Sequence, residues 1–194
     1  MTSTPRRPRG RRPAQEPPAT GSAAVDAEPD AETVARTIAL QQLAAAPRTR
    51  RQLADAMARR GVPDDVAERV LDRFEEVRLV DDAEYAAMWV RSRHGARGLA
   101  RRALAHELRQ RGVDGEDADE ALDQLDDEQE AATARALVDR RLSATRRLDR
   151  DARVRRLAGM LARKGYPASL AFRVIREALE AEGADLAGLE EPAE

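Results

Sequence analysis

The chain repeats one short pattern three times: RQLADAMARRGV at residues 51–62, RALAHELRQRGV at residues 102–113 and RRLAGMLARKGY at residues 155–166. All three fit R-x-L-A-x-x-[ML]-x-x-[RK]-G-[VY], and their glycines lie 51 and then 53 residues apart. In each copy the Leu and the later Met or Leu are four positions apart, which places them on one face of a helix. The Gly follows where that helix must end, because Gly adopts the left-handed conformation at little cost. Recurrence at this nearly constant spacing predicts tandem helical repeats.

Further helices are predicted around each copy. A second apolar helical pattern follows each glycine, with Pro63 and Pro167 at expected first-turn positions. A third helix is expected after the first two copies, at about residues 82–93 and 127–142, and an additional one precedes the first copy at about 31–46. No alternating β-branched segment indicates a strand. The sequence therefore predicts an all-α protein with tandem three-helix repeats in an elongated, curved array.

The repeat spacing also predicts domain boundaries. The two ends lack helical periodicity, the first being rich in Arg and Pro and the last acidic, so both are expected to be disordered. The expected segments are a leader at 1–30, a helical repeat domain at 31–182 (extra helix 31–46, repeat one 47–96, repeat two 97–146, repeat three 147–182) and an acidic tail at 183–194.

The composition excludes several classes of protein. Aromatic residues make up 3% of the chain and charged residues 36%, so the helices are expected to pack through thin layers of Leu, Val, Ala and Met. The absence of cysteine excludes disulfides and thiolate metal sites. No run approaches the roughly 18 apolar residues of a membrane span, and the first residues lack the apolar stretch of a signal peptide. These features predict a cytoplasmic protein.

The net charge of −2 is unevenly distributed. Residues 1–30 contain five Arg and four acids, and residues 180–194 contain six acids and no base, so the remainder carries a net charge of +3. This excess is smaller than that of a dedicated DNA-binding domain. Charge therefore favours a protein, or a protein–nucleic acid assembly, over naked DNA as the partner.

No motif indicates catalysis, a metal or a cofactor. His94 and His106 have no Cys or paired carboxylate at ligand spacing. The chain contains no G-x-x-x-x-G-K-[ST] phosphate loop and no G-x-S-x-G motif. The acidic segment at 114–120 lacks the central Gly and terminal Glu of a calcium loop. We therefore predict a protein that acts by binding and is not an enzyme.

Several segments resemble the RecX family, and its actinobacterial members in particular. In chain order they are LVDD at 79–82, Tyr85-Ala86, WVRSR at 89–93, Gly98, Leu104, Glu107-Leu108, Gly112-Val113, Leu157 and RKGY at 163–166. Together they cover about residues 31–180, and their order and spacing are specific. The basic leader and the acidic tail match no motif of the family, and the segment at 114–120 is unusually acidic.

The resemblance implies a regulator of the RecA recombinase. Members of the family lie in the helical groove of the RecA filament on single-stranded DNA. There they suppress ATP hydrolysis, strand exchange and coprotease activity, and so modulate homologous recombination, DNA repair and the SOS response. The resemblance implies no catalytic residue. We expect a monomer that contacts the filament and touches DNA directly only weakly.

Arginines are the candidates for these contacts. Arg51, Arg102 and Arg155 hold the first position of each copy, and at about 100° per residue they point away from the repeat Leu into solvent. One such Arg per unit would match a filament whose surface also repeats. The densest basic region spans the junction of copies one and two, and the planar donor fork of Arg suits carboxylates and phosphates alike. The predicted partner-binding residues are Arg51, Arg91, Arg93, Arg97, Arg101, Arg102, Arg109 and Arg155. The alternative for each is a solvated helix face or an internal ion pair.

Other notable side chains favour structural interpretations. Arg60, Arg111 and Lys164 precede the repeat glycines, where a cation offsets the helix dipole. Tyr85 and Trp89 are four residues apart on one helix. Stacking on single-stranded DNA is one role for such a pair, but packing between units is the favoured interpretation.

Two other functions compete with the filament regulator. One is a DNA-binding protein built of tandem three-helix modules of the helix-turn-helix kind. The weak basic excess and the lack of a consistently basic recognition helix count against it. The other is a structural scaffold for a different partner, since a fold alone does not determine function.

Overall fold

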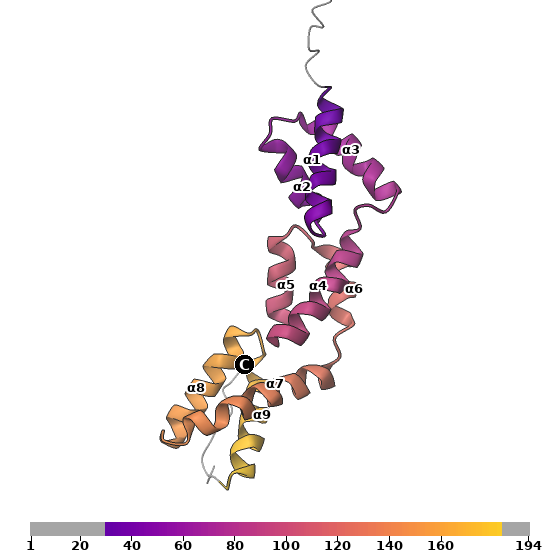
Figure 1. Cartoon of the computed structure of the whole chain (residues 1–194). Helices are drawn as coiled ribbons and strands as arrows, with labels where there is room; N and C mark the ends of the chain where they lie inside the picture. The colour runs from indigo at the N-terminus through magenta and orange to yellow at the C-terminus, as the bar shows by residue number, and fades with distance from the viewer. Residues whose placement is uncertain (1–29, 184–194) are drawn as a thin grey trace, which may run out of the picture. The chain divides into compact units, whose positions relative to one another are not determined.

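A computed structural model describes residues 30–183 of the chain (Figure 1). Within this range the chain forms α-helices and one short 3-10 helix, and it forms no strand. No helix in the range is long and apolar enough to cross a membrane. The elements are α1 (Ala31–Ala45), α2 (Arg50–Ala58), α3 (Asp64–Glu76), α4 (Asp82–Arg97), α5 (Arg101–Gln110), α6 (Gly115–Asp123), α7 (Asp127–Leu142), η1 (Ser143–Thr145), α8 (Arg150–Arg163) and α9 (Ala168–Ala181). The prediction of an all-α fold is confirmed. The predicted leader and tail fall outside the described residues, apart from Asp30 and Gly183.

Side chains cap the starts of several of these helices. Thr49 accepts a hydrogen bond from the Gln52 N–H before α2, and the Gln52 side chain accepts one from the Thr49 N–H in return, which forms a capping box. Single aspartates cap α4, α7 and α8 in the same way, namely Asp81, Asp126 and Asp149. Pro63 and Pro167 precede α3 and α9 as N-cap residues, one position before the predicted first turn. Their φ angles of −59° and −64° are those that the proline ring imposes.

The repeat glycines end α2, α5 and α8. Gly61, Gly112 and Gly165 have φ angles of +75°, +81° and +88°. The residue after each glycine donates its N–H to a carbonyl five positions earlier, namely Val62 to Met57, Val113 to Leu108 and Tyr166 to Leu161. These bonds satisfy carbonyl groups that the helix end leaves unpaired. The predicted left-handed glycine turn is thus present in all three copies.

The core forms three hydrophobic clusters. The first is built from α1–α3, the second mainly from α4–α6 and the third mainly from α7–α9. We call these groups unit one, unit two and unit three. The repeated pattern forms the middle helix of each unit, and its apolar pairs are at most 1% exposed: Leu53, Met57, Leu104, Leu108, Leu157 and Leu161.

This grouping differs from the segment boundaries expected at 47, 97 and 147. Those boundaries begin each repeat at the pattern itself, whereas each unit begins with the helix before it. The expected extra helix is therefore the first helix of unit one. Helices α4 and α7 open units two and three instead of closing the units before them. A repeated pattern locates a helix in the chain but does not specify on which side that helix packs.

Candidate partner-binding surface

Units one and two meet where α2 begins and α5 ends. The Thr49 hydroxyl donates to the Arg111 carbonyl over 2.7 Å, and the Arg50 N–H donates to Asp82 Oδ1 over 2.9 Å. Thr49 is fully buried. Burial raises the pKa of the Asp82 carboxyl above its ordinary value, although the bond from Arg50 opposes this shift. The junction thus uses donors at the start of one middle helix and acceptors in the following unit.

Units two and three meet in the same way. The Ala100 N–H donates to the Lys164 carbonyl over 2.9 Å, and the Arg101 N–H donates to Glu130 Oε1 over 2.6 Å. Both donors hold the repeat positions of the donors at the first junction. The carbonyl acceptor is again the last residue before a repeat glycine, and the carboxylate again belongs to the first turn of the next unit's opening helix. Both junctions therefore use donors and acceptors at equivalent repeat positions.

The glycines of units two and three lie against the preceding unit. A Cβ placed on Gly112 would lie 2.4 Å from Arg51 Cβ, and one placed on Gly165 would lie 2.5 Å from the backbone nitrogen of Ala103. A Cβ placed on Gly61 would meet nothing within 4 Å. Glycine in the later copies therefore serves both the left-handed turn and the close approach of two units.

Arg50 and Arg101 directly precede the first arginines of repeat copies one and two, and each is bound inside its own unit. The Arg50 guanidinium contacts three carboxylates of α3 at 2.6–2.7 Å, namely Glu68, Asp72 and Glu75. Burial opposes the charge of Arg50, but the bonds with Asp72 and Glu68 outweigh this effect and raise its pKa. Arg101, its counterpart in unit two, contacts Asp123 at 2.8 Å and the Leu125 carbonyl at 2.5 Å. Arg101, which we expected at the partner surface, thus holds α5 to the end of α6.

Trp89 lies at the contact between α4 and α5. Its Nε1 donates to Glu107 Oε2 over 2.9 Å, and the guanidinium carbons of Arg93 and Arg111 lie 4.0 and 3.6 Å from the centre of its ring. The Tyr85 ring stacks beside it, with 5.9 Å between centroids. These contacts join helices of unit two, whereas we expected the pair to pack between units. A base could stack on this indole only by displacing a guanidinium.

The arginines at the end of α4 share one acidic neighbour. Arg93 and Arg97 each lie 3.6 Å from the Glu107 carboxylate, which the indole also binds. Arg93 is half-buried and Arg97 is exposed. Both side chains therefore retain donors for a further acceptor, but their charge is partly offset within unit two.

The remaining candidates are exposed. Within residues 30–183 none of them has an acidic partner, and they are Arg51, Arg91, Arg102, Arg109 and Arg155. The arginines that begin the repeat copies thus point into solvent as predicted, while the stem of Arg51 also covers Gly112. Unpaired guanidiniums in equivalent positions are free to bind carboxylates or phosphates of a partner.

The cations before the repeat glycines have different contacts. The Arg60 side chain is exposed and makes no hydrogen bond or ion pair within residues 30–183, whereas Arg111 donates to the Glu107 carbonyl in addition to covering Trp89. Lys164 donates through Nζ to the Arg97 carbonyl, so it binds the end of α4 in unit two. Burial lowers the pKa of Lys164, and repulsion from Arg97 and Arg140 adds to this shift. The predicted pairing of a cation with a helix C-terminus is therefore seen at Arg111, within its own helix α5, and at Lys164, with a helix of another unit.

Polar groups buried between units two and three were not recognised in the sequence. His94 places Nδ1 2.9 Å from the Leu99 carbonyl and Nε2 2.9 Å from the Thr133 hydroxyl, so it connects α4 to α7. Tyr166 donates its hydroxyl to the Gly98 carbonyl. Burial raises the pKa of Tyr166 to about 12, with a further contribution from Glu130. The bonds of His94 with Thr133 and of Tyr166 with Gly98 join residues 39 and 68 positions apart, so they leave no local pattern.

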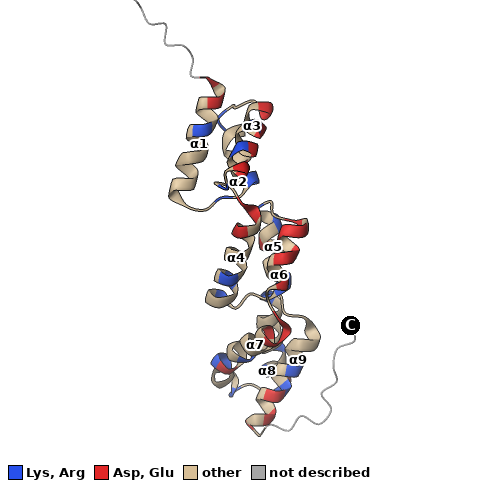
Figure 2. Cartoon of the chain, turned by 90° about the vertical axis from the view of Figure 1, so that its right-hand side faces the viewer, with Lys and Arg blue, Asp and Glu red and all other residues tan. Residues whose placement is uncertain are grey.

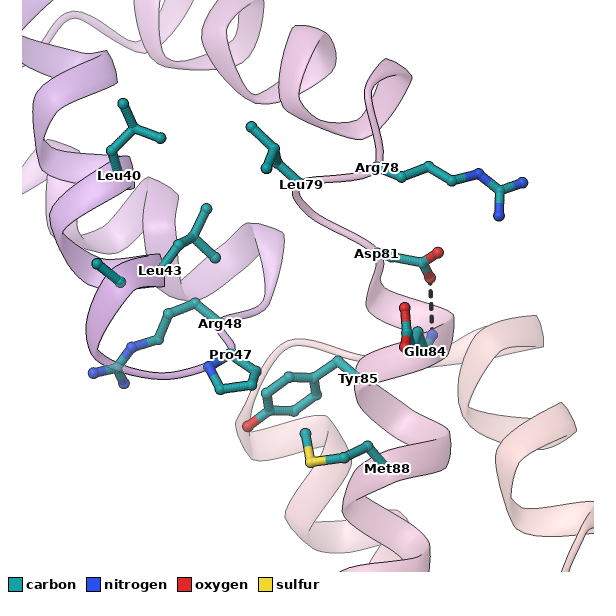
Figure 3. A pocket seen from close by; sticks show the side chains of 11 residues that line it. Leu40, Leu43, Pro47, Arg48, Arg78, Leu79, Asp81, Glu84, Tyr85 and Met88 are labelled. Atoms are coloured by element: carbon teal, nitrogen blue, oxygen red, sulfur yellow. Dashed lines mark hydrogen bonds between the residues drawn. The ribbon is translucent and has the colours of Figure 1, made fainter.

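A hollow of about 560 Å³ opens at the first junction, between the end of α1 and the start of α4 (Figure 3). Leu40 and Leu79 face it and are 46% and 50% exposed. Its rim carries both signs of charge, from Arg48, Arg78, Asp81 and Glu84. Mixed charge around an apolar floor specifies no ligand class.

Comparison with known proteins accounts for all three units. Models of the first, second and third three-helix domains of RecX match residues 35–74, 81–122 and 127–175. The regulatory protein RecX of Streptomyces lividans is 62% identical over 151 residues, which cover 78% of this chain and 80% of that protein. The protein of the same name from Thermobifida fusca is 59% identical over 169 residues, which cover 87% and 90%. The chain belongs to the RecX family.

Solved RecX structures share the fold. The crystal structure of RecX from Lactobacillus salivarius superposes with a TM-score of 0.71 at 19% identity, covering 76% of this chain and 96% of that one. A second regulatory protein RecX superposes with a TM-score of 0.69 at 25% identity. Each RecX domain match lies within one of the three units defined by the hydrophobic clusters. A regulatory role follows for this chain from its RecX relatives.

Proposed function

We propose that this RecX-family protein binds the RecA filament on single-stranded DNA and inhibits its ATP hydrolysis, strand exchange and coprotease activity. It acts in the cytoplasm by binding alone, and the ATP is hydrolysed by its partner. In this role it limits homologous recombination and the SOS response. Family membership supports the regulatory part of the proposal, and the repeated surface of the units supports a filament as the target.

The observation that carries the proposal is the equivalence of the two junctions. Each junction places an arginine directly after the backbone donors that bind the next unit: Arg51 follows the Arg50 N–H, and Arg102 follows the Arg101 N–H. Arg155 holds the same position in unit three. All three are exposed and have no acidic partner among the described residues. A filament presents one surface many times, so equivalent contacts from linked units would add through effective concentration.

We divide the predicted contact residues by their surroundings. Arg51, Arg91, Arg102, Arg109 and Arg155 are proposed as direct contacts, because their guanidiniums are exposed and unpaired within the described range. Arg93 and Arg97 are proposed as secondary contacts, since Glu107 already offsets part of their charge. Arg101 is proposed to act indirectly by holding α5 and α6 together.

The test is the DNA-dependent ATPase of a RecA from the same or a closely related organism. Increasing amounts of this protein should lower RecA turnover to a plateau, while the protein alone should hydrolyse no ATP. Binding to naked single-stranded DNA should be weaker than binding to the RecA filament on the same DNA at physiological salt. Unchanged RecA turnover at saturating protein would refute the proposal, and stronger binding to naked DNA would favour the DNA-binding alternative.

A further inference from the structure

The three units differ sharply in charge (Figure 2). Residues 81–126 contain seven basic and eleven acidic residues, whereas residues 127–182 contain thirteen basic and nine acidic ones. Several acids of unit three are already paired with neighbouring arginines: Glu182 with Arg146 and Arg153, Glu177 with Arg135, and Asp151 with Arg150. The basic excess of unit three therefore rests on its other arginines.

Three of those arginines line one hollow. It has a volume of about 210 Å³ and lies between the end of α7, the η1 turn and α8. Arg141 comes from α7, and Arg156 and Arg163 come from one face of α8, where they are seven residues apart with Met160 between them. Within residues 30–183, no acidic side chain lines the hollow and none of the three arginines has an acidic partner.

The wall of the hollow is held by bonds that leave these arginines free. The Thr145 hydroxyl donates to the Leu142 carbonyl over 2.7 Å and accepts from Arg153 Nε over 3.2 Å. Arg153 in turn binds Glu182 at the end of α9. Thr145 is 2% exposed, so these bonds are buried and fix the turn between α7 and α8. The three guanidiniums are thus gathered on a rigid frame, which limits the entropy lost when they bind an anion.

We propose that this hollow binds a backbone phosphate of single-stranded nucleic acid. Several unpaired guanidiniums around one small space match a phosphodiester, whose two non-bridging oxygens share one negative charge and each accept hydrogen bonds from more than one donor. Among the described residues no aromatic side chain lines the hollow, so they offer no platform on which a base could stack. Recognition there is independent of base sequence. The inference deepens the proposed function, since it assigns to unit three a direct contact with the DNA of the filament.

The test measures binding of the full chain to a fluorescently labelled oligothymidylate by anisotropy, without RecA, over a series of salt concentrations. Arg141→Ala, Arg156→Ala and Arg163→Ala should each weaken binding about tenfold at low salt and reduce the slope of log K against log salt by about 0.7. Arg156→Lys should retain part of the affinity, because it keeps the charge but not the fork. The matched control is Arg173→Ala on α9, which removes the same charge beside a different hollow that Asp127 and Glu130 line. The control should change affinity less than twofold, and circular dichroism should show all variants folded.

Three outcomes would overturn the inference. The first is that wild-type protein does not bind oligothymidylate even at low salt. The second is that Arg173→Ala weakens binding as much as the hollow variants do, which would show a response to net charge alone. The third is that the protein with Arg141→Ala, Arg156→Ala and Arg163→Ala combined binds DNA normally but loses affinity for the RecA filament, which would assign the hollow to an acidic protein surface. The first two results are measured without RecA, so failure of this inference can be distinguished from failure of the proposed function.

Discussion

The repeat glycines have two roles, to adopt a left-handed backbone at the helix end and to allow close approach of the preceding unit, and replacement by alanine separates them. In Gly61→Ala the new Cβ meets nothing within 4 Å, so the only cost is a left-handed backbone at φ +75°, about 1–2 kcal/mol. In Gly165→Ala the backbone cost is similar at φ +88°, but the Cβ would lie 2.5 Å from the Ala103 backbone nitrogen in unit two. Overlap with a helix backbone cannot be relieved by a side-chain rotation, and forced overpacking costs about 1–3 kcal/mol more. Gly165→Ala should therefore destabilise the protein by about 2–5 kcal/mol.

Gly112→Ala should fall between the two. Its Cβ would overlap the Arg51 side chain, whose outer atoms can rotate away although its Cβ cannot. Urea unfolding followed by circular dichroism and by Trp89 fluorescence measures all three variants, and a constant m-value would show that the unfolding transition is unchanged in kind. Equal destabilisation by Gly61→Ala and Gly165→Ala would refute the argument, because it would mean that contact with the preceding unit adds nothing to the requirement for glycine.

Three further predictions concern individual contacts. Glu130→Ala should destabilise the protein by about 1–3 kcal/mol in thermal or urea unfolding, because it leaves the Arg101 N–H without its buried acceptor, whereas Glu130→Gln keeps an oxygen there and should cost less. Bonds from Arg153 and Arg146 hold the pKa of Glu182 below its ordinary value of 4.5, so its stabilising contribution is complete above that pH and is lost as the pH falls through the folded-state pKa. The melting temperature of the wild-type protein should therefore fall further on acidification than that of Glu182→Gln. Parallel curves of melting temperature against pH would contradict the assignment. Arg102→Ala should weaken RecA-filament binding by about 1 kcal/mol or more with almost no change in melting temperature. The triple change with Arg51→Ala and Arg155→Ala should weaken it further; variants that melt early yet bind normally would show that these positions are structural.

The helices could be predicted from the sequence because their signals are local. Apolar residues four apart and a glycine after them lie within one stretch of a dozen residues, and α2, α5 and α8 form where that pattern occurs. A capping side chain also precedes α2 and α8. The grouping of helices into units could not be predicted in the same way. The grouping depends on which neighbouring helix covers each apolar face. The apolar residues of α4, for example, pack in the second cluster, although the repeat pattern assigns them to the first repeat.

Whether each arginine is paired or exposed depends on residues that are distant in the sequence. Arg50 and Arg51, like Arg101 and Arg102, are adjacent and chemically identical, yet the first of each pair is bound inside its unit and the second is exposed. A signal did exist, because Arg50 pairs with Asp72 and Arg101 with Asp123, each 22 residues further along the chain. The hollow of unit three had no such signal. Its arginines come from two helices and are brought together only by the turn at η1.

The junctions connect the stability of the fold to the proposed binding surface. At both junctions three consecutive residues make different contacts, Thr49–Arg51 at the first and Ala100–Arg102 at the second. The first residue donates to the carbonyl that precedes the next unit's repeat glycine, and the third is exposed. The second donates its N–H to a carboxylate of the next unit, while its side chain binds the third helix of its own unit. The exposed arginine is therefore adjacent to the residues that fix one unit on the next. Its position relative to the following unit is set mainly by the hydrogen bonds of the two residues before it, and at the first junction the Arg51 stem adds only packing against Gly112. The exposed arginine can therefore be replaced while the junction stays intact, whereas a change that breaks the junction must also displace the arginine. Only replacement of the arginine itself isolates its contribution to partner binding.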